Sequence, residues 1–166
     1  MLHRNTPQRY YVPGGIYFIT TKTSCNYKYF REPVLCELLM ENLIICKELK
    51  QFRLYAFCLT YDHLHLLLQP CDKYDISKVM HNLKMNLSRN INKVIDYKDP
   101  VGEDTYPHLR GNNYPKFKWQ RGFYDHVIRD EKDFENHYRY TVYNFKKHGL
   151  LDNWEYTSLN FPELIQ

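Results

Sequence analysis

Two histidines flank a single leucine in the run Asp62-His63-Leu64-His65-Leu66. The surrounding residues 54–70 are rich in β-forming side chains without helical spacing, which predicts two strands joined by a short turn. Because successive strand side chains point to opposite faces, His63 and His65 should share one face. Histidine is the commonest protein metal ligand, so the pair is a candidate half-site for one ion. The alternative is that one histidine is packed in the core and the other is exposed.

A tyrosine and an asparagine near the end of the chain could supply the second half of this site. The pattern predicts a helix that begins at Asp130 or Asp133 and ends near His148, which places Tyr140 and Asn144 four residues apart on one side. Tyr140 lies off the expected apolar stripe of this helix, which consists of Phe134, Tyr138, Thr141 and Phe145, with Val142 at its edge.

These groups could together hold a divalent metal beside a nucleophile. Two imidazoles and the carboxamide oxygen of Asn144 form a mixed nitrogen and oxygen set, which suits Mg2+ or Mn2+ better than structural zinc. The metal would polarise a phosphodiester and template its reaction, and the phenol of Tyr140 would form a covalent intermediate with it. The simpler alternative is that Tyr140 is an ordinary exposed tyrosine on a helix.

The elements that must position these groups follow the order β-α-β-β-α-β-α. Pro33 at a first helical position and Asp75 as a helix N-cap mark two of the helix starts. The strands are expected at residues 15–23, 52–59, 62–69 and 123–129, and the first helix at 33–50. The first six elements have the ferredoxin-like order, so we expect an α+β fold with an antiparallel sheet, and one domain over residues 1–166.

Composition narrows the class of protein without naming a function. The net charge of +4 is too modest to identify a nucleic-acid partner. The five cysteines are odd in number and form no CxxC pair, so we expect free thiols in a reducing compartment. Neither a signal segment nor a membrane-spanning run is evident, and a cytoplasmic location is expected.

Residues 105–124 combine basic and aromatic side chains without an acid. Cations that follow a phosphate backbone between stacking rings suit single-stranded nucleic acid. The candidate contacts here are Arg110, Lys116, Lys118, Trp119 and Arg121, with Arg9 and Tyr10 in a smaller arm near the N-terminus. The alternative is a solvated loop that Trp119 anchors in the core.

Considered together, these segments resemble a known family. The stretches are RYYVPGGIYFITTKT at 9–23, LTYDHLHLLL at 59–68, KWQRGFYDHVIRD at 118–130 and YRYTVYNFKKHGLL at 138–151. They are similar to the HUH-type single-tyrosine transposases of small insertion sequences, and most closely to the REP-associated tyrosine transposases. The family usually has a proline where Tyr61 stands, and another where Phe145 follows Asn144.

The resemblance implies a bacterial enzyme, associated with the nucleoid, that nicks single-stranded DNA at the foot of a hairpin. A 5′-phosphotyrosine link would form and leave a free 3′-OH. Tyr140 would be the nucleophile, and His63, His65 and Asn144 the ligands of Mg2+ or Mn2+. His126 would support the site or contact DNA, and His137 would bond the phenol or a phosphate. Because ligand histidines must be neutral, activity should fall at acid pH.

Two other functions are consistent with the same residues. One is a non-catalytic module that binds nucleic-acid hairpins, and the other is a metal-dependent hydrolase in which water attacks and Tyr140 is structural. The chain could act as a monomer, or as a homodimer with its tyrosines in trans.

Overall fold

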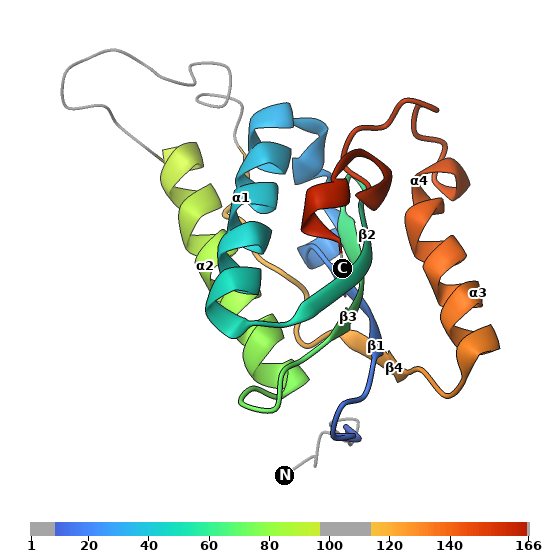
Figure 1. Ribbon diagram of the computed structural model, residues 1–166. Helices are drawn as coiled ribbons and strands as arrows, with labels where there is room; N and C mark the ends of the chain where they lie inside the picture. Colours follow the sequence, from blue (N-terminus) through green and yellow to red (C-terminus); the bar gives the residue numbers. More distant parts are fainter. Residues whose placement is uncertain (1–8, 97–113, 166) are drawn as a thin grey trace, which may run out of the picture.

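The computed structural model describes residues 9–96 and 114–165, and confirms the predicted order of strands and helices (Figure 1). The elements are β1 (Tyr17–Lys22), α1 (Pro33–Lys50), β2 (Arg53–Leu59), β3 (His63–Gln69), α2 (Ile76–Asp96), β4 (Tyr124–Val127), α3 (Glu131–Val142) and α4 (Asn144–Lys147). Short 3-10 turns follow β1 and lie near the C-terminus.

The four strands form one sheet in the order β2-β3-β1-β4, in which every neighbouring pair is antiparallel. This is the strand arrangement expected of the ferredoxin-like fold, so the predicted α+β class is confirmed. β3 lies between β2 and β1, and Thr20 of β1 is opposite His65. The two histidines therefore lie on a central strand, and β4 forms the edge beside β1.

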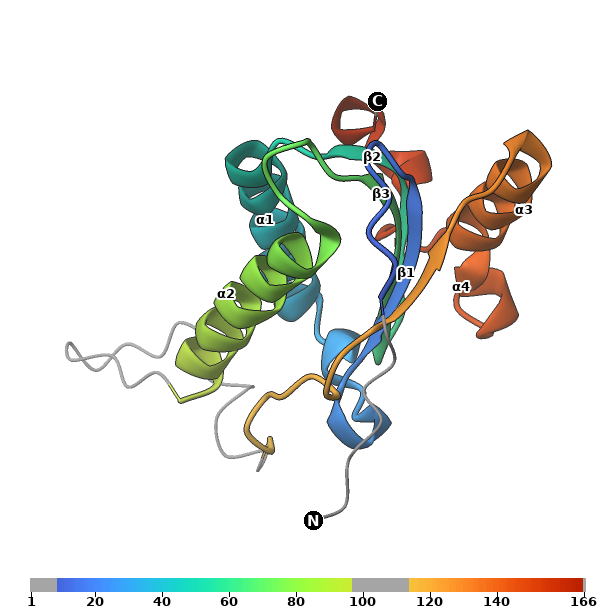
Figure 2. The same cartoon turned by 90° about the horizontal axis from the view of Figure 1, so that it is seen from below.

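Helices cover both faces of the sheet, with α1 and α2 on one side and α3 and α4 on the other (Figure 2). Leu64, Leu66 and Leu68 are fully buried within the cluster that includes α1 and α2. Leu67 instead belongs to a smaller cluster with Phe18 and Val142 of α3. Because side chains alternate along β3, His63 and His65 share the face of Leu67, beneath α3.

The predicted helix starts are confirmed by their caps. The side chain of Asp75 accepts a hydrogen bond from the backbone N–H of Lys78 at 2.8 Å. Asp130 likewise accepts one from the N–H of Asp133 at 2.8 Å. Each bond satisfies one of the N–H groups that a helix start leaves unpaired.

The predicted third helix is not continuous, because α3 ends at Val142 and α4 begins at Asn144. Tyr143 between them has φ −103° and ψ 14°, outside the helical region. The expectation that Tyr138 belongs to the core was also wrong, since it is 37% exposed. α3 contacts the sheet along a narrow stripe that includes Phe134 and Val142. Tyr138 lies beside that stripe, with its ring stacked on Phe134 at 6.2 Å.

Within residues 9–96 and 114–165, no helix combines the length and apolar character that a membrane span requires.

Candidate active site

Both histidines of the His63-Leu64-His65 run are buried, with ring centroids 4.8 Å apart. Nδ1 of His63 lies 2.6 Å from Oδ1 of Asp62 and 2.7 Å from Oγ1 of Thr60. Nδ1 of His65 lies 2.8 Å from Oγ1 of Thr20 on the neighbouring strand. These bonds orient both rings through Nδ1 and leave each Nε2 for another partner, which is the usual arrangement around a metal.

A third imidazole joins the pair from the end of α4. The ring centroid of His148 is 4.5 Å from that of His63. One ring nitrogen from each of His63, His65 and His148 lies within 4.8 Å of the others. No role was assigned to His148 from the sequence, which predicted it as the end of the helix. Its spacing of four residues from Asn144 was the available signal.

Asn144 completes this group from the first position of α4. Its side chain is close enough to His65 to affect the pKa of that ring, and the residue is 1% exposed. Among residues 9–96 and 114–165, no hydrogen-bond partner is present for Oδ1 and Nδ2 of Asn144 or for Nε2 of His65, and all three atoms are buried. Since buried polar atoms are nearly always paired, unpaired ones gathered at one place form a candidate ligand-binding site. Imidazole nitrogens and an amide oxygen fit a divalent metal.

The electrostatic environment keeps two of these imidazoles in the form that binds metal. Burial, followed by repulsion from His63 and His148 in their protonated forms, lowers the pKa of His65 to about 3. Burial and then His63 also lower the pKa of His148. Neutral imidazole is the metal-binding form, so two of the three rings are held ready for an ion.

Tyr140 lies on α3 beside this cluster. Its ring centroid is 5.5 Å from that of His65 and 5.7 Å from that of Phe18, both in edge-to-face contact. Nζ of Lys147 lies 4.9 Å from the centroid of the Tyr140 ring. Tyr140 is 40% exposed and faces a pocket of about 370 Å3, which is lined by Phe18, Thr20, Tyr124, Asn136, His137 and Tyr140. A substrate can therefore reach the phenol next to the histidine cluster.

His126 and His137 both contact the buried carboxylate of Asp133. Nε2 of His126 lies 2.8 Å from one Asp133 oxygen and Nδ1 of His137 lies 3.1 Å from the other. Burial opposes ionisation of Asp133, but hydrogen bonds from His126 and Arg129 outweigh it and hold the pKa of Asp133 well below its usual range. His137 is thereby held with its side chain lining the pocket of Tyr140.

Several predicted DNA contacts lie on the opposite side of the sheet. Arg9, Lys116, Lys118, Trp119 and Arg121 line a groove beside α2. Trp119 is also the expected core anchor, since its ring lies 5.2 Å from that of Phe117. Tyr10 is 72% exposed. Arg110 lies outside the described residues.

Comparison with known proteins identifies the family. The family model described as "Transposase IS200 like" matches residues 16–141. The chain belongs to the IS200-like transposase family. Two REP-associated tyrosine transposases are similar to this IS200-like transposase, and in each the match covers 92% of the present chain. The one from Haemophilus influenzae is 29% identical over 84% of its length, and the one from Escherichia coli is 24% identical over 81%.

Solved structures show the same fold as this IS200-like transposase. A REP-associated tyrosine transposase bound to a REP hairpin superposes with a TM-score of 0.73, at 20% identity. The match covers 98% of the present chain and 89% of that one. A transposase from Deinococcus radiodurans matches with a TM-score of 0.53 at 15% identity, over 90% and 98% of the two chains. The family resemblance seen in the sequence is confirmed.

Proposed function

We propose that the chain nicks and rejoins single-stranded DNA near a hairpin, with Tyr140 as the nucleophile. The observation that carries this proposal is the edge-to-face contact of Tyr140 with His65, beside three imidazoles and an unpartnered buried amide. An exposed phenol next to a set of nitrogen ligands suits covalent phosphoryl transfer assisted by a metal ion.

In the proposed reaction, the phenol oxygen of Tyr140 attacks the scissile phosphorus. A bond forms between that phosphorus and the tyrosine oxygen, and the bond to the 3′ oxygen breaks. The phenol loses its proton and the departing oxygen gains one, which leaves a free 3′-OH and a 5′-phosphotyrosine link. Attack by a 3′-OH on this link reverses the step and rejoins a strand.

The residues that would hold the metal are His63, His65, His148 and Asn144. When bound, Mg2+ or Mn2+ would act as a Lewis acid and neutralise charge on the phosphate. The third imidazole makes the ligand set richer in nitrogen than the sequence suggested, and such a set suits a transition metal better than Mg2+. Thr20, Thr60 and Asp62 would keep the two strand histidines in the required orientation.

The proposed partner is DNA that carries a hairpin flanked by single strands. One solved relative of the same fold is bound to a REP hairpin. The basic and aromatic residues that line the groove beside α2 supply the charge that such a partner needs.

A labelled-oligonucleotide assay tests the proposal. Hairpins with flanking single strands, taken from repeats near the gene, are incubated with the protein and Mn2+ or Mg2+. A label at the 3′ end of the DNA should migrate with the protein after denaturation, because that part of the strand is joined to the tyrosine. A label at the 5′ end should appear in a shorter strand that is free of protein. Tyr140→Phe should abolish both signals.

Tyr138→Phe is the matched control, because Tyr138 is 37% exposed on the same helix and Tyr140 is 40% exposed. It should retain the adduct. Cleavage without an adduct would indicate a hydrolase in which water attacks, and binding without cleavage would indicate a DNA-binding module. Either result would overturn the role of Tyr140.

A further inference from the structure

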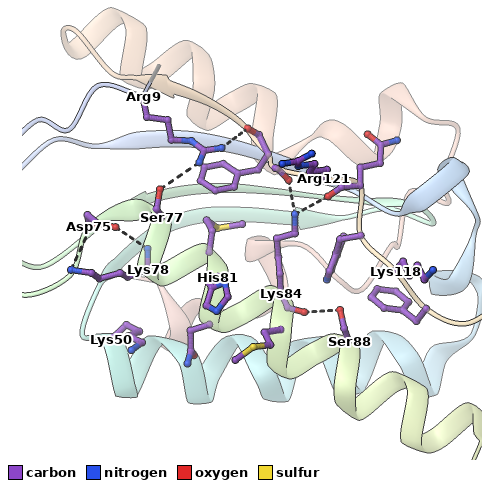
Figure 3. Close-up of a pocket in the computed structure, with 18 of the residues that line it drawn as sticks. Arg9, Lys50, Asp75, Ser77, Lys78, His81, Lys84, Ser88, Lys118 and Arg121 are labelled. Atoms are coloured by element: carbon purple, nitrogen blue, oxygen red, sulfur yellow. Dashed lines mark hydrogen bonds and ion pairs between the residues drawn. The ribbon is translucent and has the colours of Figure 1, made fainter. Parts of the chain in front are cut away.

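A groove of about 1060 Å3 lies between α2 and residues 116–123 (Figure 3). Its two walls lie on the side of the sheet that α1 and α2 cover, opposite to α3 (Figure 2). Phe117, Trp119 and Phe123 on one wall pack against the main hydrophobic core, which makes that wall well anchored. The catalytic chemistry proposed above does not use this groove.

The groove is strongly positive. Its lining includes Arg9, Lys50, Lys78, Lys84, Lys116, Lys118 and Arg121. Among the lining residues that the structure describes, the one carboxylate is that of Asp75, which lies 3.5 Å from Nζ of Lys78. Burial, and then the neighbouring charge of Arg9, lowers the pKa of Lys84 to about 8. This excess of cations is complementary to a polyanion.

Two of these cations are structural. Nζ of Lys84 donates to the carbonyl oxygens of Gln120, at 3.0 Å, and Gly122. Arg9 donates to the carbonyl oxygen of Phe123 at 3.1 Å, and its guanidinium lies 3.6 Å from the centroid of the same residue's ring. These contacts hold the wall of the groove in place (Figure 3).

Three other cations are available to a ligand. The side chains of Lys116, Lys118 and Arg121 are exposed, and none has a hydrogen-bond or ion-pair partner among residues 9–96 and 114–165. They lie along the 116–121 wall, two and then three residues apart. Exposed cations spaced along one wall suit successive phosphates of a strand.

Two buried polar atoms on opposite walls are unsatisfied. Within the part of the chain that the structure describes, Nε1 of Trp119 is a donor without an acceptor, and Oδ1 of Asn82 on α2 is an acceptor without a donor. Both residues line the groove. The Watson–Crick edge of each nucleobase carries an acceptor beside a donor, in an order that differs between the bases, and can therefore satisfy both atoms. A peptide would also offer both, but would not require the surrounding cations.

The wall of the groove leads to the pocket of Tyr140. Residues 116–123 run directly into β4, and Tyr124 at the start of that edge strand is 61% exposed. Tyr124 lines the pocket of Tyr140. A strand held along residues 116–121 can thus continue across the edge of the sheet to the phenol.

We propose that this groove binds single-stranded DNA next to the cleavage site, with one base held between Asn82 and Trp119 and phosphates on Lys116, Lys118 and Arg121. The inference deepens the proposed function and rests on it for the identity of the strand. The base contacts give selectivity, and the three cations give affinity that depends on salt.

The experiment measures binding of 3′-fluorescein-labelled 12-residue homo-oligomers of dA, dC, dG and dT by anisotropy, without metal, across a range of salt concentrations. Lys118→Gln and Arg121→Gln should each weaken binding and reduce the slope of log affinity against log salt by about 0.7. Asn82→Ala and Trp119→Phe should weaken the preferred oligomer about tenfold with an unchanged slope. Arg53→Gln, an exposed cation on the opposite edge strand, should change nothing.

A second readout locates the base. Binding should quench tryptophan fluorescence in the wild type, and the quenching should be absent in Trp119→Phe, which retains Trp154. Three results would contradict the proposed role of the groove. These are quenching that persists in Trp119→Phe, an oligomer affinity that is unchanged in the groove variants, and a wild type that does not bind the oligomers. The adduct assay is independent of these binding measurements. If the wild type forms the adduct but the groove variants bind DNA as well as the wild type does, only the groove proposal is refuted. If the groove variants bind DNA more weakly but the wild type forms no adduct, only the role of Tyr140 is refuted.

Discussion

Among the individual residues, His148 adds most to what the sequence suggested. Its imidazole faces His63 at 4.5 Å between ring centroids. If it is a metal ligand, His148→Gln should lower Mn2+ affinity at least about tenfold, because a coordinating nitrogen is lost. Calorimetric titration with Mn2+ measures this. His81→Gln, which changes an exposed histidine on α2, is the control and should leave the affinity unchanged. If the wild type, His148→Gln and His81→Gln bind Mn2+ with equal affinity, His148 is not a metal ligand.

The lowered pKa of His65 also predicts how the metal-free protein responds to acid. The pKa is about 3 in the folded protein and about 6.5 when unfolded, so between these values the unfolded chain binds more protons. This contribution to the free energy of unfolding is therefore complete above pH 6.5 and declines as the pH falls towards 3. Urea unfolding at pH 7 and pH 5 should show a difference on the order of 1–2 kcal/mol that His65→Gln removes. If His65→Gln loses as much unfolding free energy between pH 7 and pH 5 as the wild type does, the pH dependence does not arise from His65.

At the level of elements, the break between α3 and α4 positions the site. Phe145 follows Asn144 and packs on Cys58 and Leu150 beneath the sheet. Family members usually have proline here, and proline is tolerated in a first helical turn. Phe145→Pro should nevertheless lower the free energy of unfolding by about 3 kcal/mol or more, because the buried ring is lost. Urea unfolding checks this, with Lys146→Ala, at an exposed position, as the control. A stability equal to the wild type would show that the ring is dispensable.

This break also shows where sequence reasoning stops. Strand alternation and caps such as Asp75 are local signals, so the order of elements and the shared face of His63 and His65 could be predicted. No proline or glycine marks Tyr143 as a break. The turn there depends on burying Asn144 and Phe145 under β2 and β3, which only the folded chain reveals. The same turn brings His148 to the histidines, so the third imidazole could not be predicted.

At the level of the whole molecule, the structure bears on whether one chain or two form the site. Tyr140 contacts His65 of its own chain at 5.5 Å between ring centroids. We therefore expect the tyrosine to act in cis, with a complete site in every chain. A mixture of inactive Tyr140→Phe and inactive His65→Ala should then form no adduct. Light scattering during gel filtration, run on each protein and on the mixture, reports whether chains associate.

Exchange of tyrosines between chains would give a different and measurable result. In a randomly mixed dimer with sites in trans, half of the dimers would pair the two variants, and each would contain one intact site. The mixture would then recover about a quarter of the wild-type adduct. Tyr140→Phe lacks the nucleophile and His65→Ala lacks an intact histidine cluster, so neither variant alone can give this signal. Recovery near that level would place the tyrosine of one chain in the site of another and overturn the cis arrangement.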